Sequence, residues 1–267
     1  MRYLVLTGGG SRGAWQAGRM LKLWESGVRW DAVVGTSVGA VNAVGLSYLG
    51  PQGTVDLWRE LKGRSSVMAL NFAWPWNYTG VYNFNPLRKM LESKVKGLTP
   101  SIPAFACVVD SRRGNILHLP LAGPESTVAS RVVASCVVCG IQTPEAGLVD
   151  GGHREIAPVT WARDQGAIQV DVIATSPSSE ELDFSEPKKG SWFPAIWYAM
   201  RAIDMMTHEI WLRDLDAMPK KQVKVHAPDS SLGIDTLDYS PNAILKLINL
   251  GYGKQQIADN MQLLEPK

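Results

Sequence analysis

Near its N-terminus the chain repeats one pattern twice: a short apolar segment, a glycine-rich turn and a helical segment. In the first copy, residues 2–6 predict a strand, residues 8–13 a turn and residues 14–24 a helix. The second copy has a strand at residues 32–34 and a turn at residues 35–39, followed by a helix of small residues from 40 to about 48. Strands that alternate with helices form a mainly parallel sheet covered by helices, so the sequence predicts an α/β fold.

Four later apolar segments extend the predicted sheet. The chain has 267 residues, of which 45% are hydrophobic, so it can bury a large core. Single α/β domains often reach about 250 residues, and no change of composition marks a linker. We therefore expect one domain over residues 1–267. The further strand candidates are residues 104–109, 115–119, 167–175 and 222–226.

The charges nearly balance, with 27 Lys and Arg against 25 Asp and Glu and a formal net charge of +2. The basic residues form none of the clusters that binding to a phosphate backbone normally requires. We therefore expect no nucleic-acid partner.

The cysteines and the apolar segments favour a cytoplasmic protein. Three cysteines can form at most one disulfide, which is too few for a disulfide-held secreted scaffold. The apolar run at residues 2–6 is shorter than the roughly 7 to 15 residues of a signal-peptide core. Residues 32–55 carry no charge, but their glycines and polar side chains argue against a transmembrane helix, which needs about 20 apolar residues.

Cys136 and Cys139 have C-x-x-C spacing, and Cys107 is the third cysteine. A structural zinc site wants four ligands, and the segment offers no cation that would stabilise a reactive thiolate. We interpret these cysteines as small buried apolar residues and expect no metal site.

Residues 8–13 read Gly-Gly-Gly-Ser-Arg-Gly and satisfy the G-x-G-x-x-G pattern of dinucleotide-binding turns. Such a site also needs an acidic residue at the carboxyl end of the second strand. Asp31 has the right spacing but precedes that strand. A P-loop fails because Ala14 and Trp15 stand where Lys and Ser or Thr are required. A nucleotide-binding protein of the NAD type stays open as an alternative.

The second turn, residues 35–39, reads Gly-Thr-Ser-Val-Gly and places a serine between a predicted strand and a predicted helix. Its flanking glycines permit a strained turn that exposes the hydroxyl. Ser37 would then lie at a helix N-terminus, where backbone N–H groups, including that of Val38, favour an oxyanion. The sequence therefore makes Ser37 a candidate nucleophile, and a tight turn without chemistry is the alternative.

A nucleophilic serine needs a base, and no histidine has a convincing local setting for that role. His118 lies in a predicted strand and His208 on the polar face of a predicted helix, so we expect structural or solvated roles for both. Asp150 ends an apolar run and is followed by two glycines, which leave room beside its carboxylate. Such a segment is also a common turn, so a purely structural role is the alternative. The other histidines are His153 and His226.

Taken together and in this order, three segments resemble the signatures of the patatin-like phospholipases: residues 8–13, residues 35–39 and the Asp-Gly-Gly of residues 150–152. Residues 133–135 and 236–241 are also similar to segments of that family. The resemblance covers most of the chain. It implies a three-layer architecture with a central, mainly parallel sheet flanked by helices.

The resemblance also implies a lipid acyl hydrolase that cleaves fatty-acyl esters of phospholipids or related lipids without a metal or cofactor. Ser37 would form the acyl-enzyme and Asp150 would act as general base in a dyad without histidine. A non-catalytic lipid-binding homologue is the remaining alternative. The expected oxyanion hole comprises Gly8, Gly9, Gly10, Ser11, Arg12, Gly13 and Val38, and the glycines that support the two other motifs are Gly35, Gly39, Gly151 and Gly152.

Two segments suit peripheral contact with a membrane. Residues 72–84 hold six aromatic side chains in a stretch interrupted by Pro75 and Gly80, and Trp and Tyr favour the lipid interface. Residues 192–213 predict an amphipathic helix. Packing in the core is the alternative for both. The expected apolar face of the helix carries Trp192, Ile196, Met200, Ile203, Met206 and Ile210, and the opposite face carries Arg201, Asp204, His208 and Arg213.

Overall fold

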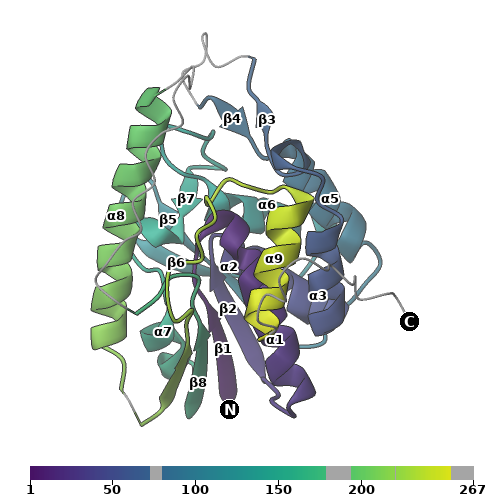
Figure 1. The fold of residues 1–267 in the computed structure, drawn as a ribbon, viewed down its shortest axis with the longest axis vertical. Helices are drawn as coiled ribbons and strands as arrows, with labels where there is room; N and C mark the ends of the chain where they lie inside the picture. The colour runs from purple at the N-terminus through teal and green to yellow at the C-terminus, as the bar shows by residue number, and fades with distance from the viewer. Residues whose placement is uncertain (73–79, 179–193, 220, 254–267) are drawn as a thin grey trace.

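The computed structural model describes residues 1–72, 80–178, 194–219 and 221–253 (Figure 1). Within these residues a seven-stranded sheet has the order β6-β5-β2-β1-β8-β9, and β7 pairs with β5 beside this path. The strands of the sheet are β1 Arg2–Leu6, β2 Ala32–Thr36, β5 Ala104–Asp110, β6 Ile116–Pro120, β7 Leu148–Asp150, β8 Gln169–Ile173 and β9 Val223–His226.

The sheet confirms the predicted fold class and all six predicted strands. β1 pairs in parallel with β2 and β8, β2 with β5, and β8 with β9. β6 and β7 run antiparallel to β5. The sequence does not predict β7, because three residues are too few to show an alternating pattern.

Helices cover both faces of the sheet, as the three-layer expectation requires (Figure 1). Along β1, Leu4 and Leu6 belong to one core cluster, whereas Tyr3 and Val5 belong to the other. Alternate residues of a strand point to opposite faces, so a strand buried on both faces is apolar throughout. The first cluster packs under α1 Gly13–Glu25, α2 Val38–Val44, α3 Gly50–Arg59, α5 Asn85–Val95, α6 Glu125–Cys136 and α9 Pro241–Tyr252, and the second under α7 Val159–Asp164 and α8 Pro194–Asp216.

The small-residue helix predicted to reach about residue 48 is shorter than expected. α2 ends at Val44, a π-helical segment follows at Gly45–Leu49, and α3 begins at Gly50. A Cβ at Gly45 would lie only 2.7 Å from the Thr54 Oγ1, so the change of helix type accompanies close packing of this segment on α3.

The apolar face predicted for residues 192–213 is not the buried side of α8 in part of that helix. Met206 is 60% exposed, whereas His208 and Trp211 are 4% and 2% exposed. The Trp211 Nε1 donates a hydrogen bond to the Pro177 carbonyl, so this strip of the helix packs inward. Trp192, the first residue of the predicted face, lies outside the described residues.

The aromatic segment at residues 72–84 falls largely on residues 73–79, which lie outside the described part of the chain. On either side of them, β3 Ala69–Leu70 pairs antiparallel with β4 Tyr82–Asn83. Phe72 is 87% exposed and Phe84 only 7%, so the two ends of the segment differ in burial. None of the described helices is both long enough and apolar enough to cross a bilayer.

Candidate active site

Ser37 occupies a strained turn between β2 and α2. Its φ of 56° and ψ of −127° are unusual for a residue with a side chain and store about 1–3 kcal/mol of strain. A side chain at Gly35 would overlap the backbone of Gly39, and one at Gly39 would overlap the Leu6 carbonyl. Both flanking glycines are therefore needed for the turn to close, and α2 begins directly after the serine at Val38.

Strand β5 brings Ser37 and Asp150 together. Thr36, the last residue of β2, pairs with Cys107, and Asp150, the last residue of β7, pairs with Val108. β6 occupies the other edge of β5, so β2 and β7 meet end to end along one edge. The turns that follow the two strands therefore lie side by side.

The Asp150 carboxyl is buried and interacts with the candidate nucleophile. Burial raises the pKa of Asp150 to about 6, and a hydrogen bond with the Ser37 side chain opposes that rise. The Gly152 N–H donates to the Asp150 Oδ1 at 2.7 Å, and the nearby His153 also lowers the pKa. A carboxylate of this kind is ionised at neutral pH yet basic enough to accept a proton.

The glycine loop lies directly against the serine turn. A Cβ at Gly8 would come within 3.1 Å of the Ser37 Cβ. Gly9 and Gly10 have positive φ values of 147° and 57°, and a side chain on either would overlap a neighbour, Thr175 or the Thr236 carbonyl. Only glycine fits at these two positions, and both glycines line the same cavity as Ser37.

Ser11 and Arg12 hold the loop in place. The Ser11 N–H donates to the Thr236 carbonyl at 2.8 Å, and its hydroxyl donates to the Asp235 carbonyl at 2.9 Å. The Arg12 Nε donates to the Ile234 carbonyl at 3.1 Å. The expected role of Ser11 as an oxyanion donor therefore needs correction, because its N–H already has an acceptor.

Ser135 on α6 supports the serine turn from behind. The Ser37 N–H donates to the Ser135 Oγ at 2.9 Å, and that hydroxyl donates to the Cys107 carbonyl at 2.6 Å. Ser135 is fully buried. One side chain thus ties α6 and β5 to the strained residue, a role that the sequence pattern alone does not reveal.

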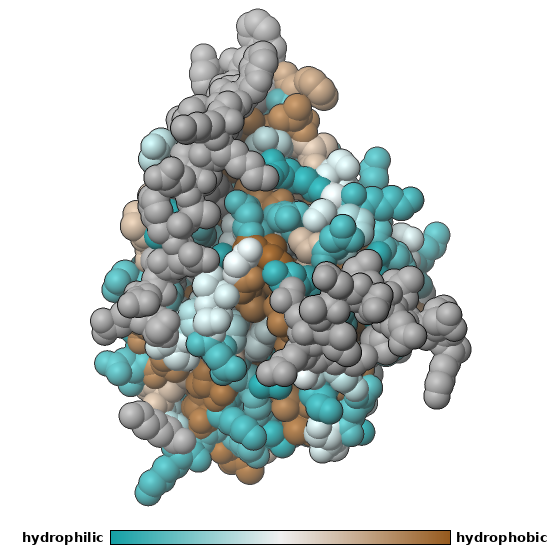
Figure 2. Space-filling view, viewed as in Figure 1, coloured by the Kyte–Doolittle hydropathy of each residue, from teal (hydrophilic) through white to brown (hydrophobic). Residues whose placement is uncertain are grey.

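A cavity of about 500 Å³ opens beside Ser37, Asp150 and the glycine loop. Figure 2 shows apolar surface near the centre of the face viewed, bordered by polar residues. The apolar part of the cavity lining includes Val41, Leu57, Trp58, Leu87 and Met90, and the side of α8 contributes the polar residues Arg201, Asp204, Thr207 and His208.

Comparison with known proteins identifies the family. The family model of the patatin-like phospholipases matches residues 4–163, a span that contains the glycine loop, the Ser37 turn and Asp150. The chain belongs to the patatin-like phospholipase family.

The patatin-like chain is similar to the lysophospholipase NTE1 of Yarrowia lipolytica, with 28% identity over 205 residues, 71% of this chain and 14% of that protein. It is 29% identical over 206 residues to the lysophospholipase NTE1 of Cryptococcus neoformans var. neoformans serotype D, covering 71% of this chain and 12% of the relative. The chain thus spans only a small part of these relatives. The crystal structure of VipD from Legionella pneumophila aligns with a TM-score of 0.42 and 13% identity over 94% of this chain and 67% of that one.

The four histidines of the patatin-like chain lie in four different settings. His118 contacts Glu155 at 2.9 Å and His226 contacts Asp171 at 3.5 Å, and neither histidine lines the cavity beside Ser37. The His153 Nδ1 lies 2.7 Å from the Asp150 carbonyl, which orients the turn after the aspartate. His208 lines the cavity and is buried, so of the two roles expected for it the solvated one is wrong.

The nucleotide alternative has no support from the geometry of the loop. Asp31 accepts a hydrogen bond from the Arg2 N–H at 2.7 Å, at the start of β2 and far from the loop. A pyrophosphate would need free hydrogen-bond donors at the loop. Both donors of Ser11 are already bound to protein, its N–H to the Thr236 carbonyl and its hydroxyl to the Asp235 carbonyl. The G-x-G-x-x-G pattern is therefore better explained by close packing beside Ser37.

Proposed function

We propose that this patatin-like chain is a lipid acyl hydrolase that cleaves fatty-acyl esters of phospholipids or lysophospholipids. The observation that carries the proposal is the meeting of Ser37, on its strained turn after β2, with the buried Asp150 carboxyl at the end of β7 on the same edge of β5. Family membership and the names of the NTE1 relatives support the same chemistry.

In the acylation step, the Ser37 Oγ attacks the ester carbonyl while Asp150 accepts the hydroxyl proton. The oxyanion that forms receives hydrogen bonds from the N–H groups of Gly9, Gly10 and Val38, for which the described residues offer no competing acceptor. The ester bond then breaks, and the protonated Asp150 returns its proton to the departing alcohol oxygen. The product of this step is an acyl-enzyme on Ser37 and a free alcohol.

In the deacylation step, water attacks the acyl carbonyl and Asp150 accepts one of its protons. The second oxyanion uses the same backbone donors and collapses to release a fatty acid, while the proton returns to the Ser37 Oγ. Asp150 ends the cycle ionised, so the two residues complete the reaction without any other titrating group.

The cavity lining fits a substrate with one apolar and one polar part. Side chains of α2, α3 and α5 form an apolar wall that suits an acyl chain. The polar strip of α8, with Arg201 and Asp204, borders the opposite side and suits a headgroup. The acyl chain would therefore extend toward α5 and the headgroup toward α8.

The same proposal includes peripheral contact with a membrane near the cavity. Leu70, Phe72 and Tyr198 are 53%, 87% and 62% exposed. Figure 1 places β3, which carries Leu70, and the first turns of α8, which carry Tyr198, at the same end of the molecule. Apolar side chains exposed together at one end suit insertion among lipid headgroups. We also place the chain in a reducing compartment such as the cytoplasm, because its three cysteines are free thiols.

The test is to incubate the purified chain with lysophosphatidylcholine and to quantify the fatty acid released. We expect release by the unaltered chain and a loss of about 10⁴-fold or more in Ser37→Ala. Binding of the lipid without release, at the same level in both proteins, would establish the non-catalytic alternative. Saturable binding of NAD, measured by fluorescence, would instead favour the nucleotide alternative.

A further inference from the structure

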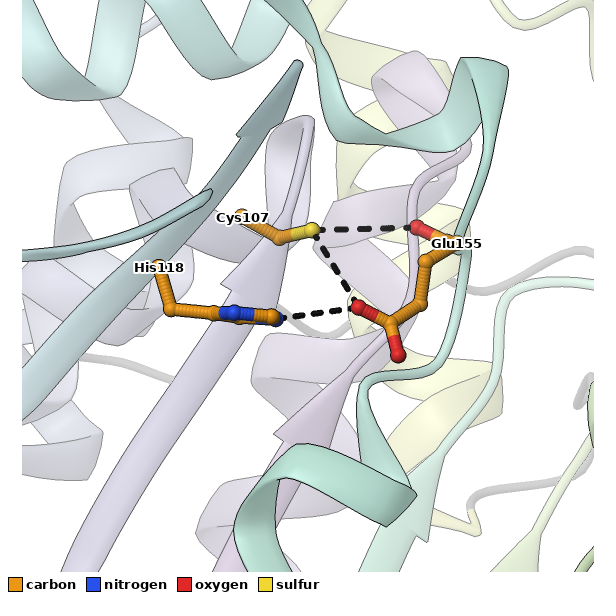
Figure 3. A group of neighbouring side chains, drawn as sticks. All are labelled: Cys107, His118 and Glu155. Atoms are coloured by element: carbon orange, nitrogen blue, oxygen red, sulfur yellow. Dashed lines mark hydrogen bonds and ion pairs between the residues drawn. The ribbon is translucent and has the colours of Figure 1, made fainter. Parts of the chain in front are cut away.

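Three side chains of metal-binding type lie together on the face of the sheet covered by α7, outside the candidate active site (Figure 3). Cys107 on β5 and His118 on β6 pair directly in the antiparallel ladder, so both project from the same face. Glu155 follows the short helical turn Gly151–His153 and reaches the pair from a third segment. Three separate segments therefore converge at one point.

The three ligand atoms are close to the separations that a tetrahedral metal requires. The His118 Nε2 lies 2.9 Å and the Cys107 Sγ 3.7 Å from the same Glu155 Oε2, and all three atoms lie within 4.8 Å of one another. Zinc bonds of about 2.0–2.3 Å at tetrahedral angles separate neighbouring ligand atoms by about 3.5 Å. Small side-chain rotations would bring the three atoms onto a common ion.

We propose that Cys107, His118 and Glu155 bind one divalent transition-metal ion, with zinc as the best match and water as the fourth ligand. Zinc accepts a thiolate, an imidazole and a carboxylate together, and three protein ligands with one open position are a known arrangement. Magnesium and calcium prefer all-oxygen ligands, of which this cluster supplies only the carboxylate.

The cluster is packed on the side of Cys107 and His118 and partly open to solvent on the side of His118 and Glu155. The Trp161 ring stacks on the His118 ring with a centroid distance of 4.6 Å and an interplanar angle of 14°. Cys107 is fully buried, whereas the His118 and Glu155 side chains are 10% and 16% exposed. An ion would therefore enter on the side of the histidine and the glutamate and bind the thiol last.

A metal here, with water in its fourth position, would join β5, β6 and the segment that follows Asp150. Gly151 packs directly over the thiol: a Cβ at that position would lie 2.6 Å from the Cys107 Sγ. The ion would thus fix the back of the turn that carries the proposed base. Ester cleavage as proposed above uses no metal, so the two proposals can fail separately.

The experiment measures metal binding by the full chain in the absence of any substrate. The chelator-treated protein is titrated with Zn²⁺ by calorimetry and with Co²⁺ by absorption spectroscopy. We expect one ion per chain, a thiolate-to-cobalt charge-transfer band, and a Tm that rises with Zn²⁺ concentration. Cys107→Ser and Glu155→Gln should each weaken affinity by at least about 100-fold, and Cys107→Ser should abolish the band.

Cys139→Ser is the matched control, because Cys139, expected from the sequence to be buried, is exposed and lies outside the cluster. It should keep the affinity, the stoichiometry and the cobalt band. Circular dichroism checks that each variant is folded, and Glu155→Gln, which keeps the size of the side chain, replaces Cys107→Ser if that variant does not fold. No saturable binding of one ion per chain, or binding that persists in folded Glu155→Gln, would overturn the proposal.

Discussion

The backbone N–H of Ser37 donates a hydrogen bond of 2.9 Å to the hydroxyl of Ser135, which is fully buried on α6. The φ of Ser37 is 56°, so the residue holds a strained conformation that needs support from its neighbours. Because the Ser135 hydroxyl also donates to the Cys107 carbonyl, one side chain fixes the serine turn to the strand that organises the site.

Ser135→Ala should lower kcat by about tenfold or more while leaving KM nearly unchanged. It removes the acceptor of the partly buried Ser37 N–H, which costs up to about 1–3 kcal/mol and lets the turn relax. Steady-state kinetics on a short soluble ester measure the effect. Ser130→Ala is the control on the same helix, since the Ser130 hydroxyl donates to Glu145 away from the turn. Equal kcat values for the two variants would contradict the positioning role.

The kcat/KM for ester hydrolysis should rise with pH around pH 6, because Asp150 must be ionised to accept the proton and its pKa is about 6. A pH profile from 4.5 to 8.5 on a neutral ester checks this. His153→Gln should move the midpoint upward, since the histidine lowers the pKa of Asp150. A profile that stays flat over this range would contradict the assignment of the base.

Asp150→Asn should stabilise the fold, and more so at high pH. The pKa of Asp150 is raised in the folded state, so folding binds a proton between its ordinary pKa and about 6. The ionised side chain therefore destabilises the fold, fully so above pH 6, by about 3 kcal/mol at most. Thermal unfolding of both proteins at pH 4 and pH 8 measures this difference. A larger gain at pH 4 than at pH 8 would contradict the prediction.

Gly10→Val should suppress kcat far more than it raises KM, because backbone donors to an oxyanion act mainly in the transition state. Any side chain at Gly10 overlaps the Thr236 carbonyl and displaces the loop. Gly97→Val is the matched control: Gly97 has a similar φ of 70°, but nothing lies within 4 Å of its missing Cβ. It should lose stability through backbone strain and keep kcat. Similar kinetic defects in both variants would remove the loop from the oxyanion hole.

Replacing Leu70 and Phe72 with Ser should lower activity on phospholipid vesicles and spare a soluble short-chain ester. Loss of exposed apolar side chains weakens adsorption without altering Ser37 or Asp150. Ile168→Ser is the control, since Ile168 is 74% exposed but precedes β8 at the opposite end of the sheet. Vesicle sedimentation, run beside the two activity assays, measures adsorption of the parent and both variants. Equal adsorption by all three proteins would contradict the proposed membrane face.

The sequence predicts the sheet well because its central strands β1, β2 and β5 are nearly continuous apolar runs between turn residues. It also singles out Ser37 as a candidate, because a serine turn flanked by glycines leaves a local signature. Asp150 becomes a candidate only through the resemblance of its Asp-Gly-Gly segment to the patatin-like phospholipases. These are features of short segments, so the pattern of neighbouring residues contains them.

Other parts of the site depend on distant partners and escape prediction. Ser135 acquires its role from Ser37 and Cys107, which lie in two other segments. The inner face of α8 was mispredicted because His208 faces a partly polar cavity, where burial no longer follows hydrophobicity. The cluster around Cys107 likewise needs the pairing of β5 with β6, which no spacing of cysteines indicates.

The central claim, that Ser37 and Asp150 act as one unit, is tested most directly by a double-mutant cycle on kcat. Ser37→Ala should cost about 10⁴-fold or more and Asp150→Asn about 10²–10⁴-fold. The double variant should be no slower than Ser37→Ala alone, because without the nucleophile the base has no proton to accept. Losses that multiply in the double variant, or an Asp150→Asn protein that keeps most of its activity, would contradict the account.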